Sequence, residues 1–246
     1  MFTVRRMMDR MKRALLVAIV LLAACSRHAD RLPGSPRLIL WAWERPERLG
    51  FLDPHSAGIA YLARTISWRD GAVTVRPRLQ PLDVPPGAWI MAVVRLESRP
   101  PLPAVEAVTR EILAAADHAG VRALQIDFDA RASEREWYAA LLHRVRDGLD
   151  PAKPLTITAL ASWCLGDPWV RDLPIADAVP MLFRMGAGEP HEVRDFSAEV
   201  CRASLGVAVD ELPYTVPHGR RLFVFAPHPW TRDTYQGAVA LARRWN

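Results

Sequence analysis

Eight short apolar runs, separated by helical or turn-rich segments, constrain the fold of this chain more than any other feature. Most of the runs are rich in valine, isoleucine, leucine or aromatic residues and lack a sustained helical period. Such runs are typical of strands buried on both faces, which is the pattern of a parallel sheet. Eight of them, with helices in between, predict an α/β fold, namely a (β/α)8 TIM-type barrel. The runs occupy residues 37–43, 58–65, 89–97, 122–129, 155–163, 177–185, 204–211 and 221–228.

Helical patterns fill only some of the gaps between these runs, so the barrel is expected to be irregular. Amphipathic segments predict helices at residues 103–120, 133–149 and 232–245. The helices after the first two strands are expected to be weak or missing, because residues 67–87 are rich in proline and contain an Asp-Gly hairpin signal. A doubly wound open sheet is the structural alternative, although no glycine-rich phosphate loop follows the first strand.

The amino terminus has the features of a bacterial lipoprotein signal peptide. Basic residues precede the apolar run 14–24, which is too short to span a bilayer and fits a secretory signal. The segment "LAAC" matches the lipobox, which implies cleavage before Cys25 and lipidation of its thiol. We therefore predict a signal peptide at 1–24, a tether at 25–36 and a single barrel domain at 37–246. A plain signal peptide with a chance cysteine is the alternative.

This reading places the mature protein in the cell envelope, held to the membrane by a lipid anchor at Cys25 and facing the periplasm or the exterior. Ser26 follows the cysteine where inner-membrane lipoproteins carry an aspartate, which favours the outer membrane by analogy. The full chain has 32 basic and 27 acidic residues, of which residues 1–24 hold five and one. The near-neutral remainder gives no support to nucleic-acid binding.

The three cysteines predict one disulfide. If Cys25 carries lipid, Cys164 and Cys201 remain as a pair in an oxidising compartment, so we predict that they are bonded to each other. Two buried free thiols are the alternative. No histidine or further cysteine stands at ligand spacing from either residue, and the sequence therefore predicts no metal site and no cofactor.

Polar residues gather at the carboxyl ends of the predicted strands, where the active sites of such barrels form. On the fourth strand, alternation puts Asp127 and Asp129 on one face, which we expect to point into the barrel. Neighbouring strands are about 4.8 Å apart, so Arg95 on the third strand is predicted to pair with Asp127. Asp127 is then a buried, paired carboxylate and Asp129 a solvent-reachable one. An interior ion network without chemistry is the alternative for both.

Carboxylates surrounded by tryptophans suggest carbohydrate chemistry. Glycoside hydrolysis needs one protonated and one ionised carboxylate, and aromatic faces stack on sugar rings. Asp129 and Glu211 are the catalytic candidates, as acid/base and as nucleophile or stabiliser, with Asp127 tuning Asp129. Core packing is the alternative for each tryptophan. The candidates for substrate binding are Trp41, Trp43, Glu44, Arg64, Arg95, Glu97, Trp163, Arg184, His228 and Trp230.

Several of these segments, taken in order, resemble family 3142 of the bacterial domains of unknown function. They are "WAWERPERLGFLDP", "GIAYLARTI", "LQIDFDAR", "TALASWC", "MLFRMG" and "LGVAVDE", and they span residues 38–230. The resemblance implies a secreted or lipid-anchored barrel with the strand-end residues as its signature, and no established activity. The segment "LQIDFDAR" also resembles the fourth-strand motif of chitinase-like glycosidases. In that motif alternate aspartates precede a catalytic glutamate, and Arg131 stands at the glutamate position here.

Two functions follow from these patterns. The first is a carbohydrate-active barrel lipoprotein of glycoside-hydrolase type, with its site at the carboxyl ends of the strands. The second is a non-catalytic lipoprotein that binds glycans or assembles with envelope partners, which the arginine at position 131 favours. The sequence leaves open whether the protein is an enzyme.

Overall fold

The computed structural model describes residues 31–184, 193, 195–213 and 215–245. The chain divides into two compact units, Met1–Pro33 and Gly34–Asn246, and the second of these contains the fold described below. The predicted signal peptide and Cys25 lie outside the described residues, as does the first half of the predicted tether, residues 25–30.

The second unit is an α/β fold built on a closed barrel of eight parallel strands. Each strand pairs with the next along the chain, and β1 pairs with both β3 and β11, which closes the barrel. Every predicted run overlaps one of these strands, as expected for apolar runs that are covered on both faces. The strands are β1 (Leu38–Ala42), β3 (Ala57–Arg69), β6 (Ile90–Glu97), β7 (Val121–Asp127), β8 (Leu155–Leu160), β9 (Asp177–Met181), β10 (Ser204–Ala208) and β11 (Arg221–Phe225).

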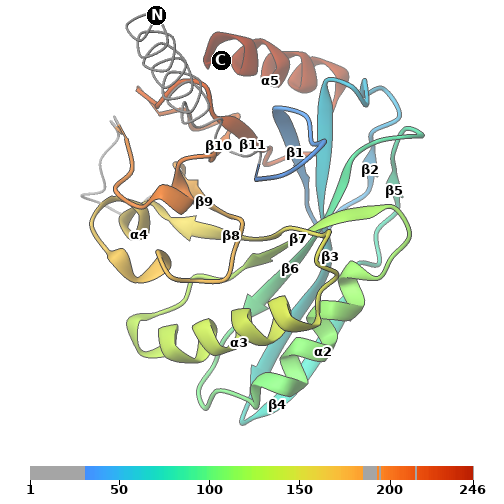
Figure 1. The fold of residues 1–246 in the computed structure, drawn as a ribbon. Coiled ribbons are helices and arrows are strands. Elements are labelled where there is room, and N and C mark those ends of the chain that lie inside the picture. The colour runs from blue at the N-terminus through green and yellow to red at the C-terminus, as the bar shows by residue number, and fades with distance from the viewer. Residues whose placement is uncertain (1–30, 185–192, 194, 214, 246) are drawn as a thin grey trace, which may run out of the picture. The chain divides into compact units, whose positions relative to one another are not determined.

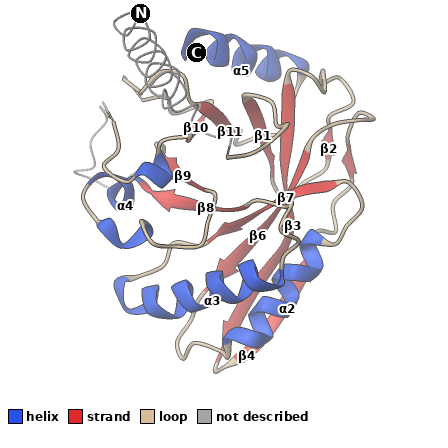
Figure 2. Cartoon of the chain, viewed as in Figure 1, coloured by secondary structure: helices blue, strands red, loops and turns tan. Residues whose placement is uncertain are grey.

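Three longer helices cover parts of the outside of the barrel, all within the predicted helical segments. Helix α2 (Val105–Ala116) lies against β6 and β7, and α3 (Arg135–Gly148) packs beside α2 (Figures 1 and 2). Helix α5 (Arg232–Trp245) lies against β1 and β11. Shorter helices are α4 (Ala161–Leu165) and the 3-10 turns η1 (Ala132–Glu134), η2 (Pro168–Val170) and η3 (Glu199–Cys201). In the part of the chain that the structure describes, no helix has the length and apolar character needed to cross a membrane.

The expected irregularity lies on the side of the first two strands. The connections from β1 to β3 and from β3 to β6 are fully described, and neither contains a helix. Instead, β3 continues past the barrel and turns back as β4 (Ala72–Pro77), which pairs with it in antiparallel register. Asp70 and Gly71 both have positive φ, at 52° and 78°, as a two-residue I′ hairpin turn requires. A short parallel pair, β2 (Glu47–Arg48) and β5 (Leu82–Asp83), ties the two connections together.

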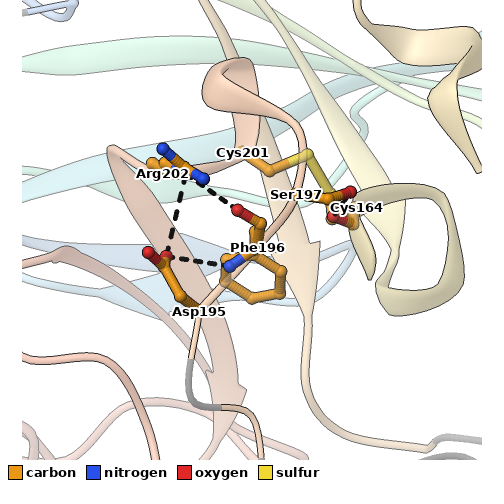
Figure 3. The surroundings of a disulfide bond; sticks show 6 residues. All are labelled: Cys164, Asp195, Phe196, Ser197, Cys201 and Arg202. Carbon is orange, nitrogen blue, oxygen red and sulfur yellow. Dashed lines mark hydrogen bonds and ion pairs between the residues drawn. A yellow bond between two sulfur atoms is a disulfide. The ribbon is translucent and has the colours of Figure 1, made fainter. Parts of the chain in front are cut away.

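The predicted disulfide is present. Cys164 on α4 and Cys201 at the end of η3 are bonded, with their Cα atoms 5.8 Å apart, and both residues are fully buried. Figure 3 shows the segment around Cys201. There, Arg202 donates a hydrogen bond to the carbonyl oxygen of Phe196 at 2.8 Å. The carbonyl oxygen of Cys164 accepts a bond from the backbone N–H of Ser197 at 2.9 Å. The disulfide therefore fixes both ends of the segment that runs from α4 through β9 to η3.

Candidate functional site

A pocket with a volume of about 630 Å³ opens at the carboxyl ends of the barrel strands. Residues from or directly after β1, β3, β4, β6, β7, β8, β9 and β11 line it, as expected where parallel strands end at one rim. Eight of the predicted site residues are among its lining: Trp41, Trp43, Glu44, Arg95, Glu97, Asp127, Asp129 and Arg184. The structure therefore brings together side chains that lie up to 143 positions apart in the sequence (Trp41 to Arg184).

Asp127 is the buried carboxylate of the pocket. Nη1 of Arg95 donates to its Oδ2 at 3.0 Å, which confirms the predicted pair, and the hydroxyl of Thr158 donates to its Oδ1 at 2.7 Å. The residue is only 6% exposed. A carboxylate removed from water needs a charged partner and further hydrogen-bond donors, and Asp127 has both. These two hydrogen bonds fix the position of the Asp127 carboxylate in the wall of the pocket.

Asp129 follows β7 and is exposed at the mouth of the pocket. Partial removal from water and the negative charge of Asp127 raise the pKa of the Asp129 carboxyl, while Arg95 opposes them. For Arg95 itself, partial burial lowers the pKa of the guanidinium, but Asp127 and Glu97 outweigh it and the pKa is raised. Asp127 and Asp129 thus lie in different environments: Asp127 is buried and paired with Arg95, whereas Asp129 is exposed.

Aromatic rings that belong to β11 or follow β1 and β9 also line the pocket. The rings of Phe183 and Phe225 are stacked with centroids 5.7 Å apart, and Trp43 meets Phe225 edge-on at 6.3 Å. Trp41 lies deeper, where its indole N–H donates to Gln125 across the barrel at 2.8 Å. Gly206 makes room for Trp41, because a Cβ atom there would lie 2.9 Å from the indole ring. Aromatic and charged side chains therefore meet in the pocket: the guanidinium of Arg95 lies 5.6 Å from the centroid of Trp43, and that of Arg184 lies 5.0 Å from the centroid of Phe225.

Arg64 was predicted to line the pocket and does not. Its guanidinium donates to the backbone oxygen and the carboxylate of Glu111 on α2, at 2.9 Å and 3.0 Å, on the outside of the barrel. The register between β3 and β6 shifts between Leu62 and Arg64, so one residue is added there. Such a bulge reverses the alternation of faces beyond it. Thr65 therefore occupies the inward position that strict alternation gives to Arg64.

Three other predicted substrate-binding residues lie outside the pocket lining. Trp163 is buried on α4, with its ring 4.9 Å from Trp169, because β8 ends at Leu160 instead of continuing to residue 163. Trp230 is buried and donates its indole N–H to the backbone oxygen of Trp41 at 2.9 Å, so it supports the rim from behind. His228 is exposed in the loop after β11.

Glu211, predicted as a catalytic partner of Asp129, is also absent from the lining. It is exposed after β10, and its Oε1 accepts a hydrogen bond from the backbone N–H of Arg184 at 2.9 Å. The carboxylate thus holds the backbone of a pocket residue. Its position after an apolar run suggested a rim residue, but the side chain turns toward the β9 connection.

Lining residues that the prediction did not name include Thr65, Arg76, Thr158, Phe183 and Phe225. Phe183 and Phe225 lie near strand ends, in line with other inward-facing residues. The prediction considered only tryptophans and charged residues there and therefore missed them. Arg76 lies on β4, and which face of the sheet its side chain occupies depends on the register of the β3–β4 hairpin, which the sequence did not show. Among the described residues, no three His, Cys, Asp or Glu side chains come together as they would around a metal ion. We assign no cofactor to the pocket.

Comparison with known proteins returned no matching family model, no matching curated protein and no matching solved structure. Membership of family 3142 therefore stays a prediction from the segments quoted above.

Proposed function

We propose that this protein is a TIM-type barrel that binds a carbohydrate chain in the pocket and cleaves a glycosidic bond there. The observation that carries the proposal is that aromatic rings and two carboxylates in different environments line the same pocket. Sugar rings present apolar faces that pack on aromatic rings and polar edges that need charged or hydrogen-bonding partners. The pocket offers both: Trp43 and Phe225 present aromatic rings, and Arg95 and Asp127 present charged groups.

Asp129 is the proposed general acid. Its raised pKa keeps a larger fraction of the carboxyl protonated than in water, and it lies at the solvent-open mouth where a leaving group departs. Asp127 is the proposed ionised carboxylate that stabilises positive charge on the sugar ring. Glu97, bound to Arg95 at 3.3 Å, is a further carboxylate of the pocket.

Replacing Trp43 by alanine should weaken glycan binding by about 2- to 10-fold, because an aromatic contact contributes about 0.5–1.5 kcal/mol. The measurement is calorimetric titration with oligosaccharides released from bacterial cell envelopes. Phe51→Ala is the matched control. Like Trp43, Phe51 is half-buried and has a guanidinium over its ring: Arg232 lies 5.8 Å from the Phe51 centroid, and Arg95 lies 5.6 Å from that of Trp43. Phe51 lies outside the pocket lining. Equal losses in the two variants, or no saturable binding at all, would contradict a glycan site.

A binding protein without catalysis is the second candidate, and one observation favours it. Both oxygens of Asp127 already accept hydrogen bonds, from Arg95 and from Thr158, as in a purely structural ion pair. In addition, Arg131, at the position of the glutamate in chitinase-like motifs, is exposed before α3 and is not part of the pocket lining. This candidate predicts saturable binding with no released product.

We also propose that the mature protein is a cell-envelope lipoprotein, anchored through Cys25. The support is the order of basic residues, apolar run and lipobox in the sequence. Replacing Cys25 by serine should abolish incorporation of radiolabelled palmitate in growing bacteria, because lipidation needs the thiol. Ser26→Ala is the control and should keep the label. A Cys25→Ser variant that is still labelled would refute the anchor.

A further inference from the structure

Two arginines of the pocket lack a carboxylate partner. Arg76 and Arg184 line the pocket, both are exposed, and neither forms an ion pair among the described residues. Arg95, the third arginine of the lining, differs because Asp127 and Glu97 bind it at 3.0 Å and 3.3 Å. The pocket therefore contains one neutralised guanidinium and two that are available to a ligand.

Arg184 is held in place by contacts on both its backbone and its side chain. Its φ of 52° lies in the left-handed region, which a non-glycine residue adopts only when its surroundings enforce it. The carboxylate of Glu211 accepts the Arg184 backbone N–H at 2.9 Å. The guanidinium lies over the ring of Phe225, 5.0 Å from its centroid, and Phe225 in turn stacks on Phe183. A guanidinium placed in this way keeps its N–H edge free for a planar anion.

The opposite side of the pocket presents the second guanidinium beside an unused hydroxyl. Thr65 pairs with Arg76 on β4 and with Arg95 on β6, so the three residues form one row across neighbouring strands. Thr65 is 4% exposed and lines the pocket, and its hydroxyl has no hydrogen-bond partner among the residues that the structure describes. Buried hydroxyls without a partner are uncommon because they lose their hydrogen bonds to water. A ligand group that reaches Arg76 and Thr65 would restore that bond.

We propose that the pocket selects a glycan that carries carboxylates, that Arg184 binds the carboxylate, and that Glu211 positions Arg184. This inference rests on the proposed glycan function and narrows it to acidic sugars such as uronic acids. Arg76 serves a second acidic group on the far side of the pocket. The selectivity is local, because Glu44, Glu97, Asp127 and Asp129 also line the pocket and its overall charge is not positive.

The test compares matched ligands that differ only in charge. Oligomers of galacturonate, glucuronate and mannuronate are titrated against the wild-type protein alongside their fully methyl-esterified, neutral forms. The acidic form of at least one pair should bind more tightly than its ester, and only its affinity should fall with added salt. Arg184→Gln should lower the affinity for the acidic ligand by about tenfold and leave the affinity for the ester unchanged. Arg232→Gln, which removes a guanidinium from over Phe51 instead, should have no effect.

Two variants of Glu211 separate positioning from catalysis. Glu211→Gln keeps an oxygen that accepts the Arg184 N–H, so it should bind the acidic ligand like the wild type. Glu211→Ala loses that acceptor and should weaken acidic binding several-fold without affecting the ester. Equal affinity for acid and ester would overturn the inference and leave a glycan site standing. Binding of neither form in any of the three pairs would overturn both proposals.

Discussion

Replacing Asp129 by asparagine should lower the rate of glycan cleavage by about 10²- to 10⁴-fold, the usual contribution of a positioned general acid. Asparagine has nearly the same shape but carries no proton that it can transfer to a leaving group. Asp129 is exposed and accepts no hydrogen bond from a side chain or backbone group of the described residues, so the variant should unfold at the same denaturant concentration as the wild type. The loss is therefore expected in kcat and not in stability.

The leaving group gives this experiment a signature that a structural role would not produce. The 4-nitrophenolate group of aryl glycosides such as 4-nitrophenyl hexuronides can leave without being protonated. The methoxy group of a methyl glycoside must be protonated as it leaves. Asp129→Asn should therefore slow the methyl glycosides much more than the aryl ones. Asp117→Asn is the control, since Asp117 is an exposed aspartate that follows α2 and precedes β7, at the opposite end of the barrel.

The pH dependence follows from the same assignment. A general acid acts in its protonated form, so wild-type cleavage should fall as the pH rises through the pKa of Asp129. Because that pKa is raised by partial burial and by Asp127, the fall should occur at a higher pH than an ordinary aspartate gives. The asparagine variant should lose this limb of the profile. A wild-type protein that binds acidic glycans but releases no reducing ends would exclude hydrolysis and favour the binding alternative.

The order of the barrel strands was predictable because burial on both faces leaves a strong mark on the sequence. All eight runs overlap a barrel strand, and the closed parallel barrel matches the predicted class, with the expected lack of helices after the first two strands. The pair between Arg95 and Asp127 was also predictable, because alternation and strand spacing together determine which side chains meet inside a barrel. These predictions depend only on regular strand geometry.

The site was harder to predict wherever that geometry is interrupted. A single added residue in β3 moved Arg64 outward and Thr65 inward, and no local sequence feature marks the bulge. The run that contains Trp163 continues in apolar character from strand into helix, so its composition conceals the end of β8. Glu211 stands near a strand end in the sequence, but its direction depends on the backbone of Arg184 in another connection.

Removing the disulfide should have the second large effect, on stability. The Cys164–Cys201 bond closes a loop with a sequence separation of 37, for which chain entropy gives about 4 kcal/mol of stabilisation. Cys164→Ala together with Cys201→Ala should therefore lower the free energy of unfolding by about that amount, measured by urea denaturation under oxidising conditions. A loss of this size is a large fraction of the stability of an ordinary domain.

The same loop carries Phe183 and Arg184, so the bond should matter for binding as well as for folding. Without it, the segment from α4 to η3 keeps the hydrogen bonds of Ser197 to the carbonyl oxygen of Cys164 but loses its only covalent cross-link. The double variant should therefore bind acidic glycans more weakly than the wild type, even at temperatures where it is fully folded. Reductant should lower the unfolding midpoint of the wild type and leave that of the double variant unchanged. Wild-type protein with the same midpoint in the oxidised and reduced states would show that the cross-link contributes nothing to the stability of the barrel.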